Sequence, residues 1–152
     1  MKIISHRANL NGCDSKNENR ILQIKKCIKL GFDVEIDIRV FENQLYLGHD
    51  NPQELISIEL LHEIRQFCWI HCKNLEALSY FNKFEQLYNY FWHENDSHTL
   101  TSQGYIWTYP GKSLEENSIY VMPELIISID DLKNVKKNKL AGICTDYPIC
   151  LI

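Results

Sequence analysis

Hydrophobic and polar residues alternate most regularly in the first third of the chain. Over residues 34–40, apolar side chains alternate with charged ones, which is the period of a β-strand, where successive side chains point to opposite faces. Glu35 and Asp37 therefore project from one face of this strand, two residues apart. A shorter alternating run at residues 45–47 follows a polar turn and leads to His49. The pattern predicts a strand, a turn and a second strand, with a histidine close to two carboxylates.

Six further apolar runs have the length of buried strands. They cover residues 2–5, 68–73, 87–92, 105–109, 118–122 and 140–144. Apolar residues at helical spacing occur in four segments between these runs. We expect helices over residues 17–30, 58–67, 74–84 and 128–138. Asn17 and Asn74 are the expected N-caps of the first and third helices, and Gly31 is a suitable stop for the first.

The order of these elements predicts the fold class. Each of the seven apolar strands is followed by a polar or charged residue, which is typical of a parallel α/β barrel, where function collects at the C-terminal ends of strands. A typical (β/α)₈ barrel takes about 250 residues, whereas this chain has 152. Residues 94–104 and 111–117 are too few for full helices. We therefore expect one α/β domain over residues 1–152, a trimmed TIM-type barrel that lacks some helices in its second half.

Composition and charge narrow the classes of partner. Hydrophobic residues make up 45% and charged residues 24%, which is ordinary for a globular domain and argues against disorder. A formal net charge of −4 argues against nucleic-acid binding, which usually shows a basic balance. No apolar run approaches the roughly 20 residues that span a bilayer. The N-terminus turns polar too early for a signal peptide, and the six cysteines lack CxxC spacing, so we expect a cytoplasmic protein without disulfides.

Polar residues at the predicted strand ends provide the candidate chemistry. They are His6, Arg7, Glu35, Asp37, His49, His71, Lys73, His93, Glu94 and Glu124. Taken singly, each has an ordinary alternative as part of a surface turn or a solvated strand face. Together they supply the parts of a phosphate site, because arginine grips phosphate oxygens in a bidentate manner, lysine supplies a point charge and imidazoles transfer protons. The carboxylate pair indicates a divalent cation, since like charges are costly to bury without compensation.

Five short motifs in this order resemble those of the glycerophosphodiester phosphodiesterase family. They are His6-Arg7, Glu18-Asn19, the segment 31–37 with its Glu-x-Asp, His49-Asp50, and the segment 142–148. The resemblance implies a TIM barrel that hydrolyses phosphodiesters, with His6 and His49 as the general acid and base and with Arg7 and Lys73 on the phosphate. It also implies that a neighbouring hydroxyl of the substrate attacks phosphorus first and gives a cyclic phosphate. Ala8 departs from the family, which has glycine at that position.

The metal-binding part of the motif set also departs from the family. The resemblance implies that Glu35 and Asp37 hold Ca²⁺ or Mg²⁺, but the third-strand glutamate that completes the family's site is His71 here. An imidazole suits softer or transition ions better, so Mn²⁺ and Zn²⁺ are alternatives. Glu94 and Glu124 are candidates for the missing oxygen ligand.

These observations predict a metal-dependent phosphodiesterase that acts on a glycerophosphodiester-like or sugar-linked small molecule or glycan, in lipid or glycan metabolism. Trp107 and Tyr109 belong either to the core or to a surface that stacks on a flat part of the substrate, such as a sugar. One alternative is a non-catalytic module that binds a phosphate or sugar phosphate and has lost turnover through the change at position 71. Another is a phosphatase or lyase acting on a sugar phosphate. The pattern does not indicate an oligomeric state.

Overall fold

The fold is built around a curved sheet of parallel strands. The computed structural model describes residues 1–84, 86–135 and 139–152. Within these ranges seven parallel strands follow the order β6-β5-β2-β1-β10-β9-β8. Their bounds are β1 (Lys2–Ser5), β2 (Asp33–Phe41), β5 (Cys68–Cys72), β6 (Asn89–Phe91), β8 (Ile106–Thr108), β9 (Ser118–Val121) and β10 (Gly142–Thr145). Each apolar run in the sequence therefore contains a strand, and the α/β class is confirmed.

Three short strands add antiparallel pairs to this sheet. β3 (Gln44–Leu47) returns along β2 after a two-residue turn at Glu42 and Asn43, whose φ angles are +49° and +61°. β4 (Glu54–Leu55) pairs with β3, and β7 (His98–Leu100) pairs with β8. The sequence predicts β3 but neither β4 nor β7, because these two strands contain no buried residue and so lie outside the apolar runs.

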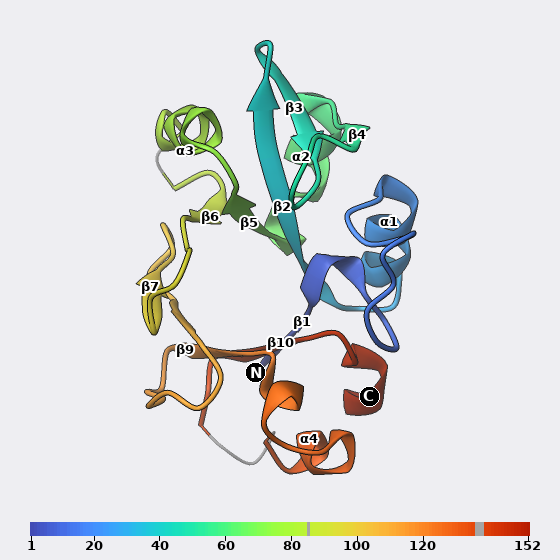
Figure 1. The fold of residues 1–152 in the computed structure, drawn as a ribbon, viewed down its shortest axis with the longest axis vertical. Coiled ribbons are helices and arrows are strands. Elements are labelled where there is room, and N and C mark those ends of the chain that lie inside the picture. Colours follow the sequence, from blue (N-terminus) through green and yellow to red (C-terminus); the bar gives the residue numbers. More distant parts are fainter. Residues whose placement is uncertain (85, 136–138) are drawn as a thin grey trace.

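The sheet curves into part of a barrel (Figure 1). β6 and β8 end the parallel series, and no strand ladder joins them in the part of the chain that the structure describes. Ser102 bridges part of this gap, because its backbone N–H donates to the Tyr90 carbonyl at 2.9 Å and its hydroxyl accepts from the Tyr90 amide at 3.0 Å. Residues 92–117 are all described and contain no helix. Residues 94–104 and 111–117, which the sequence predicts to be too short for full helices, thus contain none, and the barrel is trimmed.

The α-helices lie outside the sheet around the rest of the molecule (Figure 1), and short 3₁₀ helices follow several strand ends. They are η1 (His6–Ala8), α1 (Ile21–Lys29), α2 (Ile58–Ile64), η2 (Arg65–Phe67), α3 (Leu75–Asn82), η3 (Pro123–Leu125), α4 (Ile129–Val135) and η4 (Pro148–Leu151). The predicted end of the last helix, near Asn138, lies outside the described residues. None of the helices described has the length and apolar character that crossing a membrane requires.

The helix starts confirm one capping prediction and correct another. The Asn74 side chain caps α3 by accepting a hydrogen bond from the Ala77 N–H, as expected. Asn17 does not cap α1, which begins only at Ile21. The Asn17 amide instead donates to the Asp14 carboxylate at 2.7 Å within a preceding turn. The Asn17 side chain is therefore bound to the Asp14 carboxylate in the turn and does not serve as the N-cap of α1.

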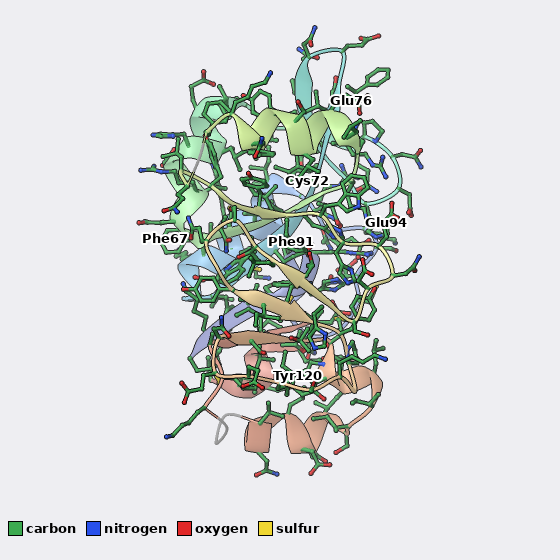
Figure 2. All side chains as sticks on the ribbon, turned by 90° about the vertical axis from the view of Figure 1, so that its left-hand side faces the viewer. Phe67, Cys72, Glu76, Phe91, Glu94 and Tyr120 are labelled. Atoms are coloured by element: carbon green, nitrogen blue, oxygen red, sulfur yellow. The ribbon has the colours of Figure 1, made fainter. Side chains whose placement is uncertain are left out.

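Apolar residues pack on both faces of the sheet. On the outer face, residues of β2 such as Ile36 pack against helical residues such as Ile24 and Leu61. Inside the barrel, Trp107 lies with its ring centroid 4.6 Å from Phe91 and 5.9 Å from Trp69. Figure 2 views the molecule from the side, with Phe67 and Glu94 toward opposite ends and Phe91 between them. An aromatic layer therefore fills the interior beneath the end of the barrel where Glu94 lies.

Candidate active site

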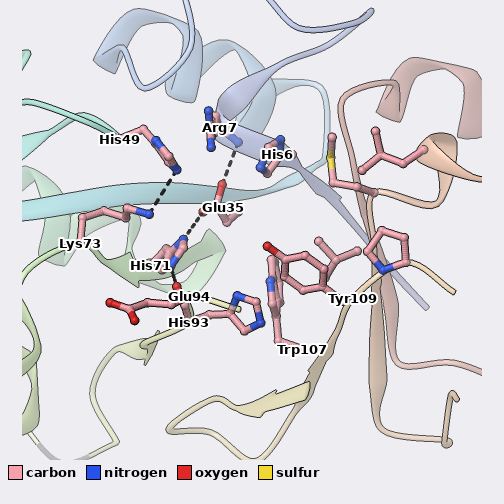
Figure 3. A pocket seen from close by; sticks show the side chains of 14 residues that line it. His6, Arg7, Glu35, His49, His71, Lys73, His93, Glu94, Trp107 and Tyr109 are labelled. Carbon is pink, nitrogen blue, oxygen red and sulfur yellow. Dashed lines mark hydrogen bonds and ion pairs between the residues drawn. The ribbon is translucent and has the colours of Figure 1, made fainter. Parts of the chain in front are cut away.

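A cavity of about 440 Å³ opens at the C-terminal ends of the parallel strands (Figure 3). Eight of the ten candidate residues line it: His6, Arg7, Glu35, His49, His71, Lys73, His93 and Glu94. Glu35 and His71 lie within β2 and β5, and the other six follow the ends of β1, β3, β5 and β6. The structure thus brings together residues that are distant in the sequence, while their chemical roles stay predictions.

Glu35, Asp37 and His71 form a compact group at the base of this cavity. Glu35 is 2% exposed and Asp37 is fully buried, at 0%. The His71 Nδ1 atom lies 3.6 Å from Glu35 Oε1 and 3.3 Å from Asp37 Oδ1. One ligand atom from each residue lies within 4.8 Å of the others, which is close enough for all three to bind one metal ion. Asp37 Oδ1 is buried and accepts no hydrogen bond from the described residues.

The other oxygens of the two carboxylates are held by the protein. The Arg7 backbone N–H donates to Glu35 Oε2 at 2.9 Å, and the Asn19 side-chain amide donates to Asp37 Oδ2 at 2.9 Å. The Asp37 N–H in turn donates to Asn19 Oδ1 at 2.9 Å. Burial opposes ionisation of Asp37, but the ion pair with His71 and the charge of Arg7 hold the pKa of this carboxyl well below its usual value. A cation would therefore meet ionised oxygens that are already oriented.

The His71 ring is fixed from its other side. Its Nε2 lies 2.9 Å from the His93 carbonyl oxygen, and because a carbonyl only accepts, Nε2 carries a hydrogen. The ring also stacks on Phe91 at a centroid distance of 4.9 Å and an interplanar angle of 15°. Burial opposes a positive charge on the ring, but the carboxylates of Asp37 and Glu35 prevail and raise the pKa of His71 to about 9.

His6 is oriented by a carboxylate that no sequence prediction assigned to the site. Its Nδ1 lies 2.9 Å from Asp146 Oδ1, which also accepts a hydrogen bond from the Asn9 side chain at 2.8 Å. Burial opposes protonation of the ring, yet the hydrogen bond to Asp146 and the charge of Glu35 prevail and raise the pKa of His6 above its ordinary value. His6 is therefore disposed to carry the proton that a general acid donates.

His49 has a similar carboxylate partner and a different second neighbour. Its Nδ1 lies 2.8 Å from Asp50 Oδ1, and its Nε2 lies 3.2 Å from Lys73 Nζ. A lysine ammonium can only donate, so Nε2 accepts in this hydrogen bond and Nδ1 donates to Asp50. His49 is therefore disposed to accept a proton, which complements His6.

Glu124 and Glu94, the candidates for an extra metal ligand, lie outside the group of Glu35, Asp37 and His71. Glu124 Oε1 accepts hydrogen bonds from the Thr145 hydroxyl at 2.8 Å and from the Asp146 N–H at 2.7 Å. Glu124 thereby holds the end of β10, which carries the partner of His6. Glu94 lines the cavity and is exposed.

The remaining wall of the cavity is largely aromatic and apolar. Tyr109 stacks on His93 with a centroid distance of 4.5 Å and an interplanar angle of 24°, and it is 39% exposed. Trp107 is only 4% exposed, because it packs into the interior aromatic layer. Tyr109 is therefore available to contact a substrate, whereas Trp107 mainly supports the floor (Figure 3).

Sequence reasoning missed the roles of Asn19 and Asp146. Both lie within the motifs quoted above, and both are polar residues that the fold buries, at 1% and 7% exposure. Asn19 has a positive φ of +53°, which asparagine tolerates better than most residues. Ala8, where the family has glycine, also takes the left-handed conformation, with φ +66°.

Two solved structures with a similar fold are glycerophosphodiester phosphodiesterases. Glycerophosphodiester phosphodiesterase from Agrobacterium tumefaciens str. C58 superposes with a TM-score of 0.59 at 14% identity, over 99% of this chain and 98% of that one. A glycerophosphoryl diester phosphodiesterase from Parabacteroides distasonis gives a TM-score of 0.60 at 10% identity, over 99% and 84% of the two chains. The chain shares the fold of the glycerophosphodiester phosphodiesterases. No family sequence model and no curated protein matches the sequence. The likeness to glycerophosphodiester phosphodiesterases is therefore one of fold, and chemistry has to be argued from the site.

Proposed function

We propose that this protein hydrolyses phosphodiesters in a reaction that depends on a divalent metal ion. The observation that carries the proposal is the pairing of two histidines in one cavity. His6 and His49 each have a carboxylate at Nδ1, and both line the cavity that contains Arg7 and Lys73. Two imidazoles, each oriented by a carboxylate, beside two cationic side chains are suited to acid–base chemistry at a phosphate.

The proposed reaction begins with attack by a hydroxyl group of the substrate on the neighbouring phosphorus. His49 takes the proton of this hydroxyl, and His6 gives its proton to the leaving oxygen as the P–O bond breaks. The products of this step are a cyclic phosphate and an alcohol. Water then opens the cyclic phosphate with the two histidines in exchanged roles. Arg7 and Lys73 bind the phosphate oxygens throughout.

The residues at the base of the cavity fit a divalent cation. Glu35 and Asp37 offer ionised oxygens, His71 offers Nδ1, and the buried Asp37 Oδ1 accepts no hydrogen bond from the described residues. When bound, the cation would supply positive charge that stabilises the charge developing on the phosphate. The family resemblance favours Mg²⁺ or Ca²⁺, and the imidazole makes Mn²⁺ or Zn²⁺ alternatives.

The substrate we propose is a glycerophosphodiester-like or sugar-linked molecule. Tyr109 presents a partly exposed ring at the cavity wall, where it can stack on a flat group of the substrate. Location in the cytoplasm and a role in lipid or glycan metabolism remain predictions from the sequence.

Hydrolysis of bis(4-nitrophenyl) phosphate and of glycerophosphocholine, each with added divalent metals, tests the proposal. His6→Ala and His49→Ala should each lower kcat by about 10²–10⁴-fold, which is the usual contribution of a positioned acid or base. His62→Ala is the matched control, because this histidine is exposed on α2, away from the cavity. Activity that survives both active-site substitutions would contradict the proposal. Micromolar binding of a phosphodiester without turnover under any metal would support a non-catalytic binding module instead.

A further inference from the structure

Three carboxylates lie on the inner face of β2, and their negative charges have different partners. Asp33, near the start of the strand, is paired with Lys2 Nζ at 2.7 Å and accepts a hydrogen bond from Trp69 Nε1 at 3.0 Å. Among the described residues, the oxygens of Glu35 and Asp37 that face His71 have no lysine or arginine partner, and the His71 imidazole lies 3.6 Å and 3.3 Å from them. The charge of Asp33 is therefore compensated within the fold, while the next two carboxylates converge on an imidazole.

The register of the sheet places that imidazole. β2 and β5 pair in parallel with Asp37 opposite His71, so the imidazole stands beside the buried carboxylate. The Nε2–H of His71 donates to the His93 carbonyl, which directs Nδ1 toward Glu35 and Asp37. A metal-binding histidine commonly uses its second nitrogen in this way, and such a bond fixes both its tautomer and its orientation.

Building on the proposed function, we infer that His71 Nδ1 makes this a site for a transition-metal ion. Zn²⁺ should bind more tightly than Mn²⁺, and both should bind more tightly than Mg²⁺ or Ca²⁺. An imidazole with two carboxylates resembles the mixed nitrogen and oxygen sets that bind zinc, whereas Mg²⁺ and Ca²⁺ prefer oxygen alone. Three protein ligands also leave coordination positions open, as in catalytic zinc sites. The buried Asp37 Oδ1, which accepts no hydrogen bond from the described residues, is the independent sign that a cation belongs here.

Metal binding can be measured without any substrate. Protein freed of metal with a chelator is titrated calorimetrically with ZnCl₂, MnCl₂, MgCl₂ or CaCl₂, and Co²⁺ loading is followed by its visible absorption spectrum. We expect one Zn²⁺ per chain, bound at least about 100-fold more tightly than Mg²⁺ or Ca²⁺, because the imidazole suits Zn²⁺ and replaces an oxygen ligand that the other two ions prefer.

Two substitutions to glutamate separate this site from adventitious zinc binding. His71→Glu should weaken Zn²⁺ binding by about 100-fold or more and strengthen Mg²⁺ and Ca²⁺ binding, since it restores an all-oxygen set. His62→Glu makes the same change on the exposed surface of α2 and should leave every affinity unchanged. His71→Gln, which removes the imidazole without adding a negative charge, replaces His71→Glu if circular dichroism shows that the acidic variant does not fold.

The outcomes distinguish the metal preference from the enzymatic activity. Equal or tighter binding of Mg²⁺ or Ca²⁺ than of Zn²⁺, unchanged Zn²⁺ affinity in His71→Glu, or no binding of any ion would overturn the preference. Phosphodiester hydrolysis with Mg²⁺ would then still support the proposed function. Conversely, tight Zn²⁺ binding that depends on His71, together with no hydrolysis under any metal, would support the site and contradict the activity.

Discussion

Replacing Asn19 with alanine removes two side-chain hydrogen bonds that hold Asp37. In the first, the Asn19 side-chain amide donates to the buried Asp37 carboxylate at 2.9 Å, and a hydrogen bond to such a charged group contributes about 1.5–3 kcal/mol. In the second, Asn19 Oδ1 accepts from the Asp37 backbone N–H at 2.9 Å, and leaving that buried donor unpaired costs about 1–3 kcal/mol. Asn19 also has φ +53°, a conformation that alanine adopts less readily than asparagine. We therefore expect Asn19→Ala to lower the free energy of unfolding by about 3–6 kcal/mol.

Urea denaturation in the presence of a chelator measures this loss without a contribution from bound metal. Asn19→Gly is the matched control, because it removes the same hydrogen bonds but tolerates the positive φ. It should be destabilised by about 1 kcal/mol less than Asn19→Ala, which separates the backbone effect from the hydrogen bonds. A loss below about 1 kcal/mol in Asn19→Ala, or a glycine variant as stable as the original protein, would refute the reasoning.

Three further changes test other parts of the site and its scaffold. His6 must be protonated to act as an acid, so activity should fall as the pH rises through its pKa, which the hydrogen bond to Asp146 raises. Asp146→Asn should lower that pKa and move the alkaline limb of the pH–kcat profile to lower pH; an unmoved limb would argue against this role. Gly48→Ala should reduce kcat by at least about 10-fold while circular dichroism stays unchanged, because its Cβ would lie 2.1 Å from the Asn51 carbonyl oxygen at φ +144° and displace the adjoining turn. Unchanged kcat would show that this turn adjusts without cost. Glu42→Asn should raise stability in thermal melts by about 0.5–1 kcal/mol, because asparagine is several-fold commoner than most residues at positive φ; a lower melting temperature would contradict this.

The strands of this fold, and the side chains that share one strand face, can be predicted from local periodicity. The alternation around Glu35 and Asp37 places both carboxylates on one strand face, since a period of two follows from backbone geometry alone. The strand ends then place His6, His49 and Lys73 near them, because parallel strands bring their C-terminal ends to one edge. These inferences need no knowledge of which side chains touch.

Contacts between distant residues could not be predicted in the same way. Asp146 is 140 residues from His6, and their contact depends on β1 and β10 being neighbours in the closed part of the barrel. Glu124 follows β9, but the turn of η3 directs its carboxylate to the end of β10. The period of two gives side-chain direction only within a strand. The direction of a residue beyond the strand end, such as Glu124, depends on the conformation of the connection.

The stability of this fold and the proposed binding of a cation depend on the same atoms. Asn19 and Arg7 hold Asp37 in an ionised, fully buried position, where one oxygen accepts no hydrogen bond from the described residues. An unsatisfied buried acceptor costs about 1–3 kcal/mol. A cation that binds this oxygen only in the folded state offsets that cost and stabilises the protein by about 2.7 kcal/mol at a concentration 100 times its Kd. If the proposed cation binds, its affinity should therefore depend partly on Asn19, which is not one of the three candidate ligands, because Asn19 orients Asp37.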